Sequence, residues 1–268
     1  MINDFIIYVF ILSFIGYIYE CLAMTIWLGK WDNRGFLFGP IIPIYGLGAL
    51  MGTIIFNFYR NFSPLSVFVI GMLGSAILEY VVHYYLEKTF HAYWWDYSSA
   101  PFNINGRICL FASIGFGLAA LIIVYIVNPV LIPFINNINP IIKQFSALMI
   151  VILVTVDTTL TIVTLSHFLE RVDNAEKYVD KHMDYLVGHI LDESNGLNNK
   201  FYDAVDRVEE SKKRIIDERI DRFVDSMSDS THRYFYRIKR FTGNNAERLN
   251  SILVKIKGKI AYNRDNER

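Results

Sequence analysis

Residues 142–168 read IKQFSALMIVILVTVDTTLTIVTLSHF, and the chain continues as LERVDNAEKYVDKH through residue 182. The first stretch holds one Lys and one Asp, whereas acidic and basic residues make up half of the second. A helix needs about 20 mostly apolar residues to cross the hydrocarbon core of a bilayer. The sequence therefore predicts a membrane-spanning helix that ends near Phe168, followed by a charged segment in water.

The composition of the whole chain agrees with a membrane protein. Charged residues are 19% of the 268, below the roughly 25% that is usual for soluble domains, and the chain has 20 Phe and 17 Tyr. The formal net charge is zero and no segment before Phe168 is basic, so we expect no nucleic-acid partner. Cys21 and Cys109 lack the paired spacing of a zinc or redox site, and we expect no metal and no cofactor.

Four more apolar stretches are long enough to cross a bilayer, which predicts about five spans. The expected spans are residues 4–28, 37–59, 64–86, 107–128 and 142–168. Ser63 and Pro64 are typical of a helix start, and we expect Asn128-Pro129 and Asn139-Pro140 to bracket a short connection. The second span contains Gly39-Pro40 and Pro43 near its start, which favours a broken or re-entrant beginning.

The basic residues of the short loops predict the orientation of the bundle. With the charged tail inside, the inner loops hold Lys30, Arg34, Lys88 and Arg107, and the outer side keeps Arg60 and Lys143. We therefore expect a multi-pass protein of the bacterial inner membrane, with its N-terminus outside and its tail cytoplasmic. The predicted fold is all-α: a membrane helix bundle over residues 1–168 and a charged, amphipathic helical tail over residues 169–268.

Apolar residues of the tail recur at steps of three and four, which predicts amphipathic helices. They are Phe201, Val205, Val208, Ile215, Ile220, Phe223 and Met227, and then Leu249, Ile252, Leu253, Ile256 and Ile260. Asn195-Gly196 and Gly243 interrupt the pattern. The stripe predicts an intramolecular hairpin or a homo-oligomeric coiled coil, and docking to another protein is the alternative. Residues 233–240 mix aromatic and basic side chains, as segments at a membrane surface do.

Three acidic residues lie deep within the predicted spans, where a central Asp costs about 2.5 to 3.5 kcal/mol on translocon scales. Glu20, Glu79 and Asp157 should share one level of the bilayer, roughly 10 to 15 Å from the inner ends of their spans. His83 follows Glu79 by four residues, so the two could pair or relay a proton. These groups could simply hydrogen-bond between helices. Their shared level favours a polar cavity that opens toward the cytoplasm.

Two inner loops carry residues that could close such a cavity. Residues 31–46 combine Gly and Pro with Arg34, and residues 94–107 combine two tryptophans with Arg107. Arg offers parallel charge-assisted bonds to a carboxylate, so we expect at least one of these arginines to pair with a buried acid. The other candidate site residues of these loops are Asn33, Tyr45, Trp95, Asp96, Tyr97 and Asn103.

The same segments resemble the CmpB-like family of bacterial type IV ABC-transporter permeases. The resemblance rests on Gly16 with Glu20 and on the sequences NRGFL (33–37), GP (39–40), PIYG (43–46), WDYS (95–98), FN (102–103) and GRICL (106–110). It covers about residues 5–168 and implies a membrane component of a transport system. It implies no particular substrate.

Three classes of function remain open at this point. The sequence favours a permease or solute-binding transport component in the lipid bilayer; because it lacks a Walker A pattern, any ABC role requires a separate ATPase subunit. The alternative is an envelope or signalling adaptor that is anchored by the bundle and works through its tail. A membrane enzyme using Glu79 and His83 as an acid-base pair or as metal ligands is the third, although no catalytic motif is present.

Overall fold

The computed structural model describes residues 1–29, 33–58, 63–193, 199–243 and 246–266. The chain divides into two compact units, each described below by itself. The first unit comprises Met1–Ile162 together with Arg237–Arg240, and the second comprises Val163–Tyr236 together with Phe241–Arg268. Lys30, Trp31, Asp32, Arg60 and the Asn195-Gly196 break, which entered the predictions above, lie outside the described residues.

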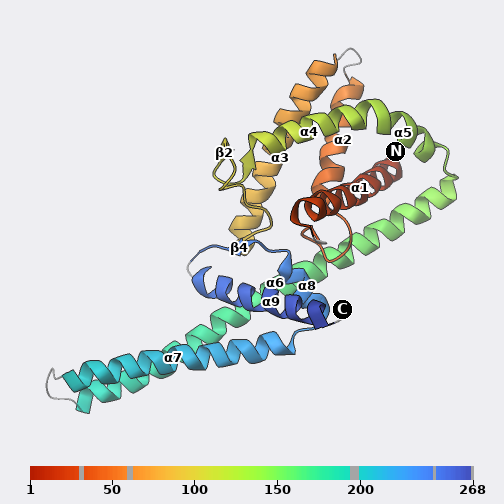
Figure 1. Cartoon of the computed structure of the whole chain (residues 1–268). Helices are drawn as coiled ribbons and strands as arrows, with labels where there is room; N and C mark the ends of the chain where they lie inside the picture. The colour runs from red at the N-terminus through yellow and green to blue at the C-terminus, as the bar shows by residue number, and fades with distance from the viewer. Residues whose placement is uncertain (30–32, 59–62, 194–198, 244–245, 267–268) are drawn as a thin grey trace. The chain divides into compact units, whose positions relative to one another are not determined.

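The helices of the first unit are long and apolar (Figure 1). Within the described part of the chain, four helical stretches have the length and composition to cross a membrane: Ile2–Ile26, Pro64–Phe90, Leu110–Asn136 and Pro140–Asn174. They belong to α1 (Ile2–Leu28), α3 (Pro64–Phe90), the run from α4 (Leu110–Ile122) through η1 (Ile123–Val127) to α5 (Asn128–Asn136), and α6 (Pro140–Glu193). The predicted all-α membrane bundle is confirmed.

The start of α3 follows from its first two residues. The Ser63 side chain accepts a hydrogen bond from the backbone N–H of Ser66 at 3.2 Å, and Pro64 occupies the first turn. A serine cap satisfies one of the orphan N–H groups, and proline has no N–H to leave unpaired. The predicted start of the third span at Pro64 is therefore confirmed.

The predicted connection after Asn128 is wrong, because the helix continues through it. The five residues of η1 form a π-helical turn, and α5 then runs to Asn136 with Pro129 in its first turn and Pro133 inside it. A π-turn shifts the hydrogen-bond register, which helps a helix absorb a residue without an N–H. In Figure 1, α4 and α5 accordingly form one continuous ribbon. Asn128 is buried within the fourth span.

The helix of the predicted second span begins later than the sequence predicts and is not among the four candidate spans of the described residues. α2 (Pro43–Phe58) has 16 residues, and residues 38–42 before it are not helical. At 1.5 Å per residue such a helix is about 24 Å long, less than the roughly 30 Å of a hydrocarbon core. Leu37, Ile41 and Ile42 in the segment that leads into α2 are nevertheless buried. A non-helical entry to the second span agrees with the break expected at the Gly and Pro residues.

Short strands order the loop between α3 and α4. β2 (Asn103–Ile104) and β3 (Ile108–Cys109) pair antiparallel, with Asn103 opposite Cys109 and Ile104 opposite Ile108. β1 (Ala92–Tyr93) follows α3, and the Tyr93 carbonyl accepts a hydrogen bond from the Lys239 N–H at 2.7 Å. The loop is therefore a folded element that can hold side chains against α3.

The second unit has a core of its own. Its elements are the C-terminal part of α6, α7 (Asn199–Ser226), α8 (Asp229–Tyr236), α9 (Ala246–Asn266) and the end of β4 (Arg240–Phe241). Phe168 of α6 is buried against Phe223, Phe235 and Phe241, with ring centroids 6.2, 4.3 and 6.0 Å away.

Part of the predicted tail stripe packs within this unit. Ile220, Leu249, Ile252, Leu253 and Ile256 are buried. The stripe therefore packs intramolecularly at these five positions, whereas Ile215 is exposed. The side chains of Phe201, Val205, Val208 and Ile260 lie outside the described set. Tyr234 and Phe235 are fully buried as well, so the predicted surface location of residues 233–240 is wrong for these two aromatic residues.

Candidate functional site

Glu20 of α1 binds two residues that lie on either side of the broken entry to α2. Its Oε1 lies 3.4 Å from Nε of Arg34, and its Oε2 accepts a hydrogen bond from the Tyr45 hydroxyl at 3.0 Å. The Arg34 side chain is only 8% exposed and that of Glu20 is 26% exposed. The structure thus pairs one of the predicted acids, partly buried, with a loop arginine, as the sequence led us to expect.

The glycine at position 16 lets the Tyr45 ring reach this place. A Cβ at Gly16 would overlap the Tyr45 side chain, including its Cδ1 at 2.8 Å, so only glycine leaves room for the ring. The ring also contacts Tyr19 edge-on at 6.4 Å and Phe116 at 5.7 Å. The small residue on α1 and the aromatic residue on α2 therefore position a hydroxyl group on the Glu20 carboxylate.

Glu79 of α3 is the most deeply buried of the three acids, with 5% exposure. Its Oε1 accepts a hydrogen bond from the Tyr97 hydroxyl at 3.0 Å, while its Oε2 has no hydrogen-bond partner among the described residues. Burial, together with the carboxylates of Glu79 and Glu20, raises the pKa of Tyr97 above its ordinary value. Tyr97 therefore stays protonated and donates to Glu79.

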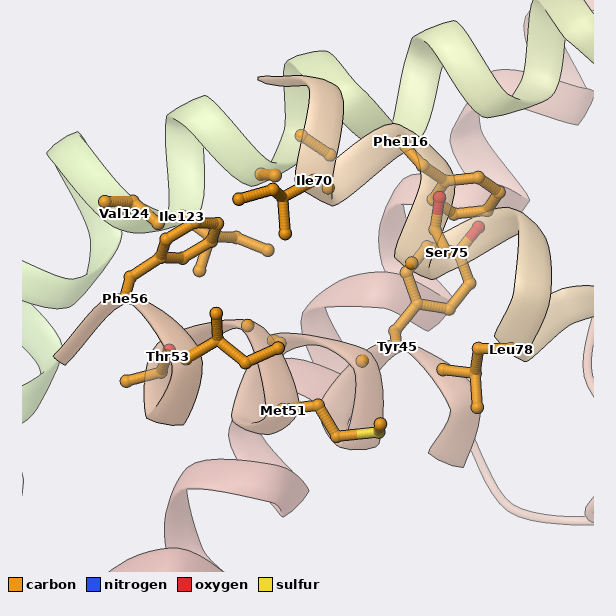
Figure 2. A pocket seen from close by; sticks show the side chains of 18 of the residues that line it. Tyr45, Met51, Thr53, Phe56, Ile70, Ser75, Leu78, Phe116, Ile123 and Val124 are labelled. Carbon is orange, nitrogen blue, oxygen red and sulfur yellow. The ribbon is translucent and has the colours of Figure 1, made fainter. Parts of the chain in front are cut away.

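A cavity of about 170 Å³ lies between α2, α3 and the run from α4 into η1, and both Tyr45 and Glu79 line it. Figure 2 shows Tyr45, Phe116 and Ser75 gathered at one end, with Phe56, Ile123 and Val124 at the other. Most of the lining is apolar. Such a cavity with a few convergent polar groups is the usual form of a small-molecule site.

His83 does not pair with Glu79, contrary to the sequence expectation. Its Nε2 lies 3.2 Å from the carbonyl oxygen of Trp95, and its ring contacts those of Tyr93 and Trp95 edge-on. The Nδ1 atom lies 3.9 Å from Oε2 of Glu87, one turn farther along α3. A shared helix face did not lead to pairing, because the folded loop after α3 supplies a partner to each side chain: Tyr97 to Glu79 and the Trp95 carbonyl to His83.

The loop residues Trp95, Asp96 and Asn103 hold the loop itself. The Trp95 indole donates to the Arg107 carbonyl at 3.0 Å, and Asn103 donates to the Ala100 carbonyl at 2.7 Å. Asp96 accepts hydrogen bonds from the backbone and hydroxyl of Ser98. These hydrogen bonds shape the loop and thereby position Tyr97 on Glu79. The three residues themselves do not line the cavity.

The charge of Asp96 is stabilised by its surroundings. Partial burial opposes ionisation, but the Ser98 hydrogen bonds and the positive charge of Arg240 outweigh it and hold the pKa of Asp96 below its ordinary value. The Nε of Arg240 lies 2.7 Å from Oδ2 of Asp96, and its guanidinium sits 4.3 Å from the centroid of the Tyr93 ring. Sequence analysis missed this contact because 144 positions separate the two charges.

Arg107 pairs with an acid that the sequence analysis did not single out. Its Nε and Nη2 both bind Oε2 of Glu87, at 3.1 and 2.8 Å, and its Nη1 donates to the Tyr80 hydroxyl at 2.7 Å. The guanidinium also lies over the rings of Tyr80 and Tyr84. Arg107 is therefore the counter-ion of Glu87 and not of Glu20, Glu79 or Asp157.

Asp157 of α6 binds the non-helical segment before α2. Its two carboxylate oxygens accept hydrogen bonds from the backbone N–H groups of Phe38 and Gly39, at 3.0 and 2.9 Å. Buried Arg237 donates to the carbonyl groups of Leu37 and Phe38. Backbone groups outside a helix must find partners in the hydrocarbon region, and these two charged side chains provide them. Asn33 lies at the start of the same loop and accepts from the Tyr17 hydroxyl at 3.0 Å.

A second polar cluster in the bundle was not predicted. Tyr8 of α1, Thr53 of α2 and Asn128 are buried, and the Tyr8 hydroxyl lies 2.8 Å from Oγ1 of Thr53 and 2.7 Å from Oδ1 of Asn128. Asn128 also donates to Thr53 at 3.0 Å. Asn128 precedes Pro129, so the sequence suggested that Asn128 lies in a loop. Had it been placed inside a span, its polar side chain would have marked it as a candidate for a buried hydrogen bond.

Comparison with known families agrees with the predicted family and with the membrane fold. Residues 7–162 match the family described as "Putative ABC-transporter type IV". The chain belongs to this family. The matched segment contains all twelve predicted site residues, from Glu20 to Asp157. Comparison with curated proteins gave no match, and neither did comparison with solved structures.

Proposed function

We propose that this family member is the membrane component of an ABC-type transport system and that it binds its solute at the Glu20–Glu79 site. This site comprises Glu20, Tyr45, Glu79 and Tyr97. The observation that carries the proposal is the cavity of about 170 Å³ that has the buried Glu79 among its lining residues. A structural acid would be expected to have both oxygens hydrogen-bonded, whereas Oε2 of Glu79 has no hydrogen-bond partner among the described residues.

Two carboxylates from different helices are held in comparable ways at this site. A tyrosine hydroxyl donates to each of them: Tyr45 to Glu20 and Tyr97 to Glu79, both at 3.0 Å. Arg34 compensates the charge of Glu20. Glu79 has no such counter-ion among the described residues. An acidic residue at membrane depth is costly and is usually functional, so its presence supports a role in binding or passing a solute.

A separate subunit must supply the energy for transport in this proposal. The chain has no Walker A sequence, so it does not cradle ATP phosphates in that way. The partner is therefore an ATPase that carries its own P-loop. We place the tail and the inner loops on the cytoplasmic side, where such a subunit would bind, following the positive-inside rule.

The test is to purify the full chain gently from its native membrane and to identify its partners by native mass spectrometry. We expect a stoichiometric complex with an ATPase whose hydrolysis rate, measured in nanodiscs, depends on this chain. Glu20→Gln should lower that hydrolysis rate at least tenfold. The variant should still form the complex, and its thermal unfolding should be nearly unchanged.

Asp4→Asn is the matched control because Asp4 lies on the same helix and pairs with Lys143 at 2.6 Å, away from the cavity lining. It should leave the hydrolysis rate unchanged. Recovery of the chain alone, as a monomer or homo-oligomer without an ATPase, would contradict the proposal. Activity would then be sought in the tail.

A further inference from the structure

The cavity is sized for a small apolar group. Its volume of about 170 Å³ is close to that of an engineered cavity of about 150 Å³ that stays dry and binds benzene. Aliphatic and aromatic side chains from α2, α3, α4 and η1 form most of the wall, with Ile70, Phe56 and Ile123 among them. A body of about six carbon atoms therefore fits this space, whereas a sugar or a nucleotide would leave its polar groups unpaired.

One residue that lines the cavity, Glu79, has a carboxylate oxygen without a hydrogen-bond partner among the described residues. Glu79 is 95% buried, and only its Oε1 has a hydrogen-bond partner, the Tyr97 hydroxyl. No Lys or Arg of the described part of the chain forms an ion pair with Glu79, whereas Glu20 has Arg34 as its partner. A buried carboxylate without a cation or a full set of donors is costly, so a cationic donor at Oε2 would relieve that cost.

Aromatic rings that line the same cavity add to the preference for a cation. Tyr45 and Phe116 both line the cavity, and their ring centroids lie 5.7 Å apart. A cation over such a ring face gains about 0.5 to 2 kcal/mol. Anionic ligands are disfavoured for the same reasons, because they would meet a carboxylate and the negative faces of the rings.

We propose that the cavity binds a small primary amine in its protonated form, with an apolar body of about six carbons and its ammonium group on Oε2 of Glu79. This inference names the solute class of the site and therefore rests on the proposed function. An ammonium group brings three donors: one binds Glu79, and the others can face Tyr45 and Phe116. The apolar body occupies the space between α2, α3 and α4.

The test measures the binding of benzylammonium and of neutral benzyl alcohol to the purified full chain in nanodiscs by calorimetry. Titrations into empty nanodiscs correct for partition into lipid. We expect benzylammonium to bind at least tenfold more tightly than benzyl alcohol to the unmodified chain. Glu79→Gln should remove at least tenfold of the affinity for benzylammonium and leave that for benzyl alcohol within twofold.

Two glycine substitutions separate the apolar part of the site from its charge. A Cβ at Gly74, which lines the cavity, would meet no atom within 4 Å, so Gly74→Leu should fill the space without a clash and block both ligands. Gly115 on α4 is equally open but does not line the cavity. Gly115→Leu is therefore the matched control and should bind both ligands normally.

The possible outcomes separate this inference from the proposed function. Equal binding of the amine and the alcohol, or a Glu79→Gln variant that binds benzylammonium normally, would overturn the amine site even if an ATPase co-purifies. Selective amine binding that is lost in Glu79→Gln and Gly74→Leu would support the amine site. If no ATPase were found in that case, only the transport role would fail, because the binding assay does not need a partner.

Discussion

Gly46 on α2 should be the position in the bundle where an added methyl group costs most. A Cβ there would overlap the Val9 carbonyl oxygen and the Ser13 hydroxyl of α1, and would lie 2.9 Å from the Val9 carbonyl carbon. Two of these three atoms belong to the main chain of a helix and cannot turn away. Overpacking costs about 1 to 3 kcal/mol, and a main-chain obstacle puts Gly46→Ala near the upper end.

The net effect also includes the intrinsic preference of alanine for helices. Replacing Gly by Ala inside a helix gains about 1 kcal/mol, so Gly46→Ala should destabilise the chain by about 2 kcal/mol. Gly52 lies in the same helix, where a Cβ would meet only the Phe56 ring at 3.6 Å or more, an ordinary contact. Gly52→Ala should therefore stabilise by up to about 1 kcal/mol, which puts the two variants about 3 kcal/mol apart.

The assay is equilibrium unfolding of the purified full chain in mixed micelles of a mild detergent and increasing dodecyl sulfate, followed by tryptophan fluorescence. The unfolding midpoints of Gly46→Ala and Gly52→Ala should fall on opposite sides of that of the unmodified chain. Equal midpoints for the two variants would refute the reasoning, because they would mean that α1 and α2 do not approach at Gly46 as closely as the structure places them.

Three further predictions concern the polar contacts. Asn128→Leu should destabilise the same unfolding equilibrium by about 1 to 3 kcal/mol, because it removes two buried hydrogen bonds and leaves the Tyr8 and Thr53 hydroxyl groups with only each other as partners; a neutral effect would contradict the buried cluster. The pKa of Asp96 is lowered in the fold, so its contribution to stability is present above the unfolded pKa of about 3.9 and is lost as pH falls through the folded value. Hydrogen exchange of residues 94–107 should therefore accelerate in acid, and Asp96→Asn should remove that dependence. Asp157→Asn keeps one acceptor oxygen and loses the other, so exchange at Phe38 or Gly39 should rise severalfold while α3 stays protected; unchanged exchange would show that Asp157 does not hold this segment.

Several parts of this molecule could be predicted from local sequence because their physical causes are local. Hydrocarbon requires long apolar helices, so runs such as residues 142–168 identify spans without knowledge of their neighbours. The Ser63-Pro64 start is equally local, since a cap acts within one turn. The cost of an acid in hydrocarbon singled out Glu20, Glu79 and Asp157 before any contact was known.

Pairing of side chains across the fold could not be predicted in the same way. Helical spacing suggested Glu79 with His83, but the loop after α3 brings Tyr97 to one and the Trp95 carbonyl to the other. Arg107 was expected at a buried acid and instead binds Glu87. Spacing determines which face of a helix a residue occupies, whereas the partner depends on which loop packs against that face.

The sequence by itself determined that this chain is a helical membrane bundle with a charged tail, because the bilayer imposes the length and polarity of each span. It also singled out three acidic residues that are expected at membrane depth. Only the tertiary structure decided that the helix continues through Asn128, that Arg237 binds the carbonyl groups before α2, and that a cavity ends at Glu79. These features depend on how helices from distant parts of the sequence pack together. The residue pattern of a single helix shows which face is apolar, but it does not identify the helix that packs against that face.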